Sequence, residues 1–189
     1  QAFRGEDDLS VWQRIIGACD SLRRAADPAT VPAFRRWFLD LIGPVRARLG
    51  GEPVAGEPER TSQLRGALFS AAGTLGDDTT AIERARALVD RGGGDPALVA
   101  AAIDIVAAHG DAGTHARYVD RMTSAASPQE AERYRGALAD FPGSDEVRRT
   151  LELTLDGSIR TQDVPFVIRR ALRNHAQGAT AWAFVTERW

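Results

Sequence analysis

The side chains that could do chemistry in this chain begin with its three histidines, His109, His115 and His175. His109 and His115 are six residues apart with Gly110 between them. They therefore cannot share one helical face, as the two histidine ligands of an HExxH zinc site must. A metal cluster of His109, Asp111 and His115 is disfavoured for the same reason. We interpret His109 as the end of a helix that is followed by a surface loop.

Other groups of potentially reactive residues also lack the necessary spacing. Cys19 lies among apolar residues at helical spacing, which is typical of a buried small hydrophobe and not of a nucleophile. Asp77 and Asp78 supply too few oxygen ligands for a calcium loop, so we interpret them as a loop that caps the next helix. The glycines at 92–94 follow a predicted helix and not a strand, which argues against a phosphate-binding loop.

The composition excludes several classes of function. All 24 basic residues are arginines, which excludes chemistry that needs lysine, such as a Walker phosphate site or a Schiff base. The net charge of −2 argues against a nucleic-acid-binding surface. The 43% hydrophobic and 26% charged content is typical of a soluble folded domain. Neither a membrane-spanning run nor a signal segment is visible, so we predict a cytoplasmic protein that does not bind membranes.

The elements that must position these residues are predicted to be helices throughout. Apolar residues recur at intervals of three and four, as in the run Leu64, Ala67, Leu68, Ala71 and Leu75. A capping side chain directly precedes a proline at Asp27–Pro28, Asp95–Pro96 and Ser127–Pro128, which is the pattern of a helix start. Ser127 and Glu130 also have the spacing of a capping box. The sequence therefore predicts an all-α fold.

The predicted helix starts are evenly spaced. First helices are expected at Thr61, Asp95, Ser127 and Thr161, in steps of 34, 32 and 34 residues, and second helices near Asp78, Thr114, Ser144 and Ala176. This period predicts a right-handed α-solenoid of irregular antiparallel helix hairpins, similar to HEAT or armadillo repeats. We expect one helical domain over residues 1–189, with a long helix pair at 1–49, a flexible loop at 50–60 and about four hairpins at 61–189.

The tryptophans lead to separate predictions. Trp12 and Trp182 lie on apolar stripes, so we expect both in the core. Trp37 either packs against a neighbouring helix or contacts a domain that is absent from this chain. Trp182, Val185 and Trp189 would share one helical face, which we expect to dock on the helix at 164–172 and to close the end of the solenoid.

The order of several short motifs resembles the C-terminal helical domain of M1-family zinc aminopeptidases of the aminopeptidase N type. A "QD" helix start corresponds to Gln162–Asp163, a helix-ending "N" to Asn174, and a terminal "aW.f...nW" helix to residues 181–189. Upstream matches are Asp8–Trp12, Leu64–Arg65, Gly110–Asp111, Gln129–Glu130 with Arg133, and Ala137–Ala139. The resemblance covers nearly the whole chain. The chain also begins at Gln1 and has its only methionine at Met122, so we expect it to be part of a longer protein.

The resemblance implies that this domain closes over the active site of a zinc-dependent catalytic domain and shapes the chamber that receives peptides. No residue here matches the family's zinc ligands, catalytic glutamate, exopeptidase loop or transition-state tyrosine, so we expect no catalytic or metal-binding residue in the chain itself. The expected partners are the catalytic domain of the same polypeptide and the peptide substrate.

Arg65 is the predicted substrate-binding residue, because a guanidinium matches a peptide carboxylate; the alternative for Arg65 is an ordinary surface arginine. Two other functions stay open for the chain as a whole. One is a stand-alone α-solenoid scaffold that binds a protein partner along its concave face. The other is a hydrolase that uses His109 or His175, although no base–nucleophile pair is visible.

Overall fold

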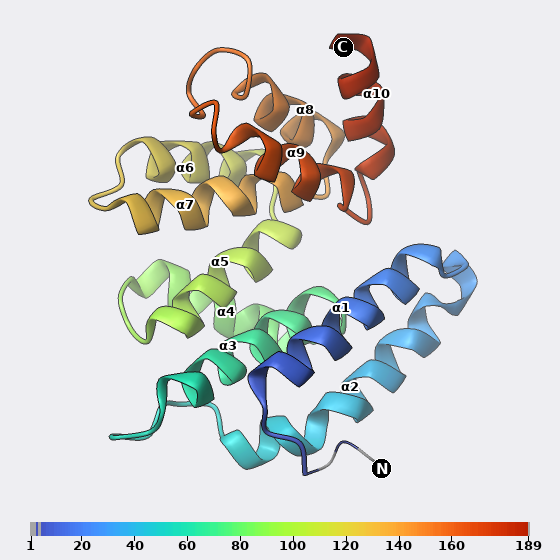
Figure 1. Ribbon diagram of the computed structural model, residues 1–189, viewed down its shortest axis with the longest axis vertical. Helices are drawn as coiled ribbons and strands as arrows, with labels where there is room; N and C mark the ends of the chain where they lie inside the picture. The colour runs from blue at the N-terminus through green and yellow to red at the C-terminus, as the bar shows by residue number, and fades with distance from the viewer. Residues whose placement is uncertain (1–2, 4, 189) are drawn as a thin grey trace. The chain divides into compact units, whose positions relative to one another are not determined.

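The computed structural model of the protein describes residues 3 and 5–188. Within these residues the chain forms ten α-helices, two short 3-10 helices and no β-strands, which confirms the predicted all-α class (Figure 1). The helices are α1 (Leu9–Ala25), η1 (Pro28–Thr30), α2 (Val31–Leu49), α3 (Glu59–Thr74), α4 (Thr79–Arg91), α5 (Pro96–Ala108), α6 (Ala112–Thr123), α7 (Pro128–Ala137), η2 (Leu138–Asp140), α8 (Ser144–Glu152), α9 (Val164–Leu172) and α10 (Gly178–Arg188). None of the described helices combines the length and the apolar composition that crossing a membrane requires.

The chain divides into two compact units, each with its own internal packing. Unit 1 covers Gln1–Ile105 and contains α1 to α4 with most of α5; unit 2 covers Val106–Trp189 and contains α6 to α10. We describe the two units separately. The expectation of a single domain and that of a solenoid superhelix stay predictions.

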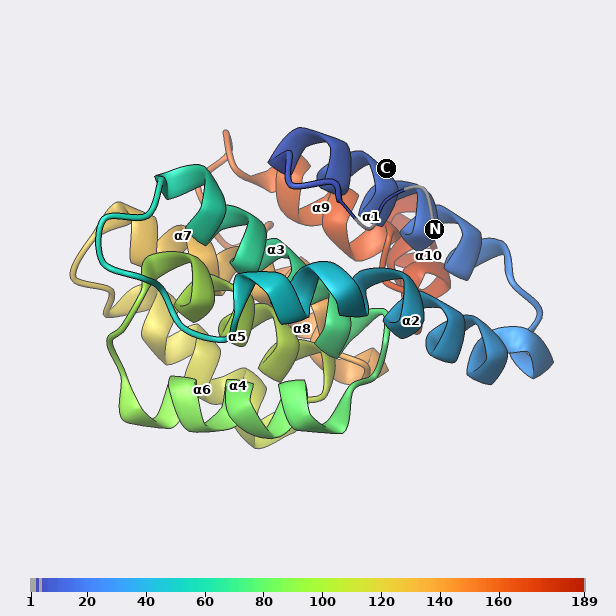
Figure 2. The ribbon, with the colours of Figure 1, turned by 90° about the horizontal axis from the view of Figure 1, so that it is seen from below.

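In unit 1, α1 and α2 form a long antiparallel hairpin that packs against α3 (Figures 1 and 2). The core between these helices contains the fully buried side chains of Trp12, Phe38, Ile42, Leu64 and Leu68. α3 also lies very close to α5, because a Cβ atom added at Gly73 would come within 2.7 Å of the Ile105 side chain. Glycine is therefore required at this point of α3.

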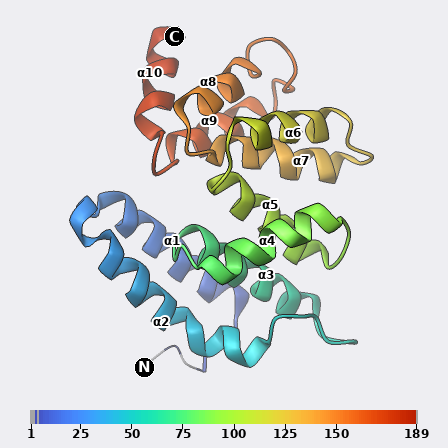
Figure 3. The same ribbon diagram turned by 180° about the vertical axis from the view of Figure 1, so that it is seen from behind.

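In unit 2, α6 and α7 lie side by side, and η2, α8, α9 and α10 complete the packing (Figure 3). The centre of the unit is Phe141, whose side chain is fully buried. His115 and Tyr118 of α6 place their rings edge-on to it, with centroid distances of 5.0 and 5.7 Å. Leu138 and Leu151 are also fully buried. This is an ordinary apolar core with aromatic pairs in their preferred arrangement.

The helix starts use the capping side chains that the sequence indicated. Asp27 and Asp95 each accept hydrogen bonds from first-turn amides through Oδ1. Ser127 Oγ accepts from the amide of Glu130 at 3.2 Å, and the Glu130 carboxylate accepts from the amide of Ala126 at 3.1 Å. The backbone groups at these helix ends are thereby satisfied by local side chains.

The observed helix boundaries differ from the expected starts by two or three residues at four places. α3 begins before Thr61, at Glu59, and α6 begins before Thr114, at Ala112 with Asp111 as its cap. α9 and α10 begin later than expected, at Val164 and Gly178. The first helix pair, α1 and α2, lies within residues 9–49, and the following loop covers residues 50–58.

The prediction of a core position for Trp182 is wrong. Trp12 is fully buried as predicted, but 61% of Trp182 is exposed. α10 packs against α8 and α9 with its opposite face, which carries the buried Ala181 and Phe184. Trp189, which was expected on the docking face, lies outside the described residues. Trp37 is also exposed, and its ring centre lies 5.7 Å from that of Phe34 on the same helix.

Candidate functional site

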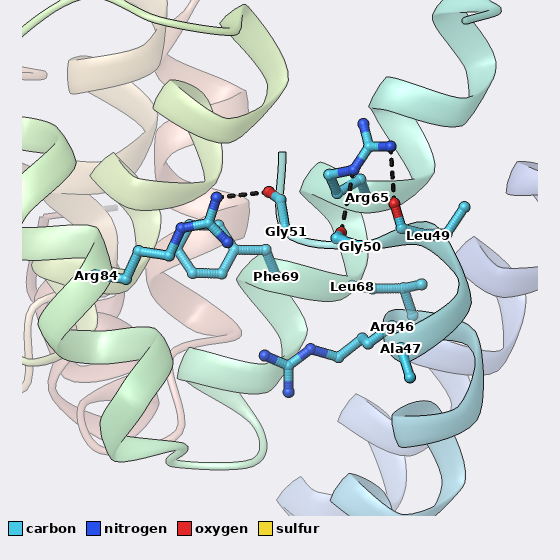
Figure 4. Close-up of a pocket in the computed structure, with 9 residues that line it drawn as sticks. All are labelled: Arg46, Ala47, Leu49, Gly50, Gly51, Arg65, Leu68, Phe69 and Arg84. Atoms are coloured by element: carbon cyan, nitrogen blue, oxygen red, sulfur yellow. Dashed lines mark hydrogen bonds between the residues drawn. The ribbon is translucent and has the colours of Figure 1, made fainter. Parts of the chain in front are cut away.

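A pocket in unit 1 is lined by three arginines from three different helices. Arg46 comes from the last turn of α2, Arg65 from α3 and Arg84 from α4, and the backbone of residues 49–51 completes the wall (Figure 4). The pocket has a volume of about 270 Å³. Leu68 and Phe69 of α3 form its apolar part. We call this site the arginine pocket.

The turn at Gly50 and Gly51 brings the chain to the pocket. Gly50 ends α2 with a φ of 69°, and its amide donates to the carbonyl of Arg46 at 3.1 Å. This left-handed backbone is the usual reason for glycine at a helix end. At Gly51, a Cβ atom would come 3.2 Å from a terminal nitrogen of Arg84. The two glycines therefore let the loop turn sharply beside an arginine side chain.

Arg65 is buried, with only 5% of the residue exposed. Its terminal nitrogens form a two-point ion pair with Glu57 at 2.5 and 2.7 Å, and it also donates to the carbonyls of Leu49 and Gly50 at 3.1 and 3.3 Å. The hydrogen bond between the two side chains raises the pKa of Arg65 and lowers the pKa of Glu57. Arg65 therefore fastens both ends of the 50–58 loop to α3.

These contacts bear on the two alternatives for Arg65. It is not a surface arginine, since its guanidinium is buried and hydrogen-bonded to the chain itself. Its predicted contact with substrate stays a prediction, and the structure gives the side chain a structural use in addition. The position follows from the sequence of α3, because Leu64 and Leu68 are buried one turn apart and set the orientation of the helix.

Arg84 and Arg46 are less enclosed than Arg65. Arg84 lies over the ring of Phe69, with 5.0 Å from the guanidinium carbon to the ring centre. Its Nη2 atom donates to the carbonyl of Gly51 at 2.6 Å and to the Glu52 carboxylate at 2.9 Å. Arg46 donates from Nη1 to Asp78 at 2.8 Å. Asp78 also caps α4 with its other oxygen, as the sequence indicated.

Sequence reasoning missed Arg46 and Arg84 because their partners are distant in the chain. The pairing of Arg46 with Asp78 and that of Arg84 with Glu52 both span 32 residues. No local pattern marks such a pair. The only signal was the run of glycines that follows the arginine-rich end of α2.

All three histidines belong to unit 2. His115 Nε2 lies 2.8 Å from the hydroxyl of Thr150, and both side chains are buried. Thr150 in turn donates toward the carbonyls of Leu138 and Glu146, at 3.0 and 2.9 Å. Burial lowers the pKa of His115, so the neutral imidazole is favoured. The arrangement is that of a satisfied core histidine.

Asp111 has a structural role next to this histidine. Its Oδ1 atom accepts from both the amide and the hydroxyl of Thr114 at 2.8 Å, which caps α6. Within residues 3 and 5–188 no group of three or more His, Cys, Asp or Glu side chains is arranged to hold a metal ion. Cys19 is buried as predicted, and burial raises the pKa of its thiol.

Several motif residues prove to be structural. Asp8 caps α1 by accepting from the amides of Ser10 and Val11 at 2.7 and 3.0 Å. Trp12 is fully buried and donates from its indole nitrogen to the carbonyl of Glu6 at 3.1 Å. These two residues fix the start of α1 on the core of unit 1.

The motif residues of unit 2 join separate elements. Asp163 forms an ion pair with Arg135 of α7 at 3.1 Å. The side-chain amide of Asn174 donates to the carbonyls of Ala139 and Phe141, both at 2.9 Å. Its oxygen accepts from the backbone amides of residues 176 and 177, which lead into α10. These contacts give structural roles to Asp163 of the "QD" motif and to Asn174 at the "N" position.

Comparison with known proteins agrees with the order of these motifs. The family model for the ERAP1-like C-terminal domain matches residues 1–189. The chain is 27% identical over 200 residues to Aminopeptidase M1-A of Oryza sativa subsp. japonica, which covers 100% of this chain and 23% of that protein. It is 26% identical over 196 residues to the Alanine/arginine aminopeptidase of Saccharomyces cerevisiae, covering 99% of this chain and 23% of that protein. The chain therefore spans about a quarter of the length of these relatives.

Proposed function

Because the chain belongs to the ERAP1-like C-terminal domain family, we propose that it is the C-terminal helical domain of a zinc-dependent M1 aminopeptidase and has no catalytic activity alone. The observation that carries this proposal is the family match over the whole chain. Relatives named as aminopeptidases, about four times as long as the matched segment, support it. The rest of the polypeptide would then supply the catalytic domain with its zinc ion.

The proposed role of this domain is to cover the active site and to shape the chamber that receives the peptide. Its partners would be the catalytic domain of the same polypeptide and the peptide substrate. The all-α architecture and the absence of a metal-binding cluster among the described residues are consistent with this supporting role. Arg65 keeps its place as a proposed substrate contact, and the cytoplasmic location also stays a proposal.

The experiment compares three proteins: the isolated chain, the full-length parent, and a parent that ends before residue 1 of this chain. Each is assayed with amino-acid anilides and with peptides of increasing length, and its zinc content is measured by elemental analysis. We expect hydrolysis and one zinc per molecule in the full-length parent, and neither in the isolated chain.

The shortened parent should cleave short anilides but lose its discrimination between peptides of different length, because the chamber wall is gone. An isolated chain that binds zinc one-to-one and hydrolyses anilides would contradict the proposal. Unchanged length discrimination in a soluble shortened parent would contradict the chamber role alone.

A further inference from the structure

The arginines of the arginine pocket have more hydrogen-bond donors than their acidic partners use. Arg46 donates to Asp78 from Nη1 alone, and Arg84 makes both of its described hydrogen bonds from Nη2. Among the described residues, no hydrogen bond uses Nε or Nη2 of Arg46, or Nε or Nη1 of Arg84. Arg65 differs, because Glu57 meets it with both oxygens. The unused donors therefore belong to Arg46 and Arg84.

The two side chains extend from helices on opposite sides of the pocket, α2 and α4 (Figure 4). A guanidinium presents parallel N–H groups that match two oxygens of a carboxylate or phosphate. A pocket of about 270 Å³ has room for such a group and for part of the molecule that carries it. The cation–π contact with Phe69 holds the Arg84 guanidinium in place before a ligand binds.

One carboxylate of the chain itself, that of Glu52, already contacts an arginine of this pocket. Glu52 lies on the 50–58 loop with 76% of its side chain exposed, and it contacts Arg84 through a single nitrogen. Exposed ion pairs of this kind contribute little to stability, so a better-placed anion can displace the Glu52 carboxylate. We propose that the arginine pocket binds an oxyanion, a carboxylate or a phosphate group, between Arg46 and Arg84, in competition with Glu52. This inference does not depend on the proposed function of the parent.

The test measures binding to the isolated chain by the change in the amide NMR signals of Gly50 and Gly51. The probes are inorganic phosphate, N-acetyl-trialanine with a free carboxylate, and its C-terminal amide. The variants are Arg46→Gln, Arg84→Gln and Glu52→Gln. The matched control is Arg86→Gln, because Arg86 is an exposed arginine on α4, the helix that also carries Arg84. Melting temperatures of all variants show whether each one is folded.

We expect Arg46→Gln and Arg84→Gln to weaken binding by at least about tenfold, because each removes a charged hydrogen-bonding partner of the anion. Glu52→Gln should strengthen binding roughly two- to fivefold, because it removes the internal competitor. Arg84→Gln and Glu52→Gln break the same ion pair. If each acted only by loosening the 50–58 loop, both would change the affinity for the anion in the same direction. Arg86→Gln should bind as the parent chain does.

The peptide acid and phosphate separate the two sources of the anion, and binding of either supports the proposal when the variants respond as stated. The inference is overturned if neither probe binds, if the peptide amide binds as tightly as the acid while phosphate does not bind, or if Glu52→Gln weakens binding as Arg84→Gln does. Loss of folding in Arg84→Gln leaves Arg46→Gln and Glu52→Gln to decide.

Discussion

The guanidinium of Arg65 contacts the Glu57 carboxylate and the carbonyls of Leu49 and Gly50 at the same time. Its position on α3 followed from the apolar spacing around it, but its partners are 8 to 16 residues away, in the 50–58 loop and at the last residue of α2. Periodicity carries no information about such a loop. The capping residues were predictable for the opposite reason, since Asp95 and Ser127 act on amides two or three residues away.

Replacing Arg65 with methionine keeps an unbranched apolar stem and removes the charge and the hydrogen-bond donors of the guanidinium. The Glu57 carboxylate and the carbonyls of Leu49 and Gly50 then lose their donor, so we expect a loss of about 2–3 kcal/mol of folding free energy. Urea unfolding followed by circular dichroism measures this change. Arg86→Met is the exposed control and should change stability by less than about 0.5 kcal/mol. A stable Arg65→Met chain would favour the alternative that Arg65 serves substrate binding.

His115 should make the stability of the protein depend on pH. Its pKa in the folded protein is lowered from the ordinary value of 6.5 by burial. The unfolded chain therefore binds the proton first as the pH falls. Stability from this residue is complete above pH 6.5 and is lost as the pH decreases from there toward the lower folded pKa. For one proton, the free energy of unfolding changes by at most about 1.4 kcal/mol per pH unit.

The check is a series of urea titrations between pH 7 and pH 5 on the parent chain and on His115→Gln. Glutamine does not titrate in this range but can still contact Thr150. The free energy of unfolding should depend less on pH in His115→Gln than in the parent chain. The stability of the variant at pH 7 should also be lower. Equal slopes would show that other groups dominate the acid sensitivity.

At the scale of the element, α10 shows why the docking face was assigned wrongly. Ala181, Trp182, Phe184 and Val185 spread apolar character over much of the helix circumference. Periodicity then permits two faces, and the larger side chain of Trp182 favoured the wrong one. The small Ala181 lets α10 approach its neighbours closely, while Phe184 fills the space beside it. Only the surface of α8 and α9 decides between the two faces.

The two faces of α10 should respond differently to truncation. Phe184→Ala removes a buried aromatic side chain and should cost about 3–5 kcal/mol of folding free energy. Trp182→Ala should stay within about 0.5 kcal/mol, because most of the side chain is already in water. Thermal melts of the two variants provide the comparison. If Trp182→Ala is the more damaging change, the original assignment of the core face is restored.

Asn174 joins α9, η2 and the start of α10 through one side chain. Asn174→Ala removes two bonds to backbone carbonyls and a helix cap, so we expect a loss of about 2–3 kcal/mol. Asn174→Asp keeps the capping oxygen and replaces the two donors by a charge that faces the carbonyls of Ala139 and Phe141. It should therefore destabilise at least as much as alanine at pH 7, which urea unfolding can test. A harmless Asn174→Asp would mean that the cap is the main contribution.

At the scale of the whole molecule, the helical class and the helix order were predictable because they depend on local periodicity and caps. The division into two compact units was not predicted. Regular spacing of hairpins says nothing about how much packing each hairpin shares with the next. The arginine pocket could not be predicted from the sequence either, because it requires α2, α3 and α4 to be placed around a loop.

Both units are held by apolar cores, around Trp12 and Phe38 in unit 1 and around Phe141 in unit 2. We therefore expect removal of divalent metal to leave the isolated chain folded. Overnight treatment with a chelator should leave the melting temperature of the purified chain within about one degree, because no described side-chain cluster would lose a ligand. The untreated chain in the same buffer is the control. A fall of several degrees that added zinc reverses would reveal a structural metal site.

The contrast between Trp12 and Trp182 has an optical consequence. Trp12 moves from a dry interior to water when unit 1 unfolds, so its fluorescence emission should shift to longer wavelength. Trp182 is the tryptophan that the structure describes in unit 2, and its indole is already largely hydrated in the native protein. Its emission should hardly change on unfolding. The emission shift of Trp12 therefore reports on unit 1, whereas unit 2 can be followed by the near-ultraviolet dichroism of Tyr118 and Tyr134, whose rings pack edge-to-face at 5.0 Å.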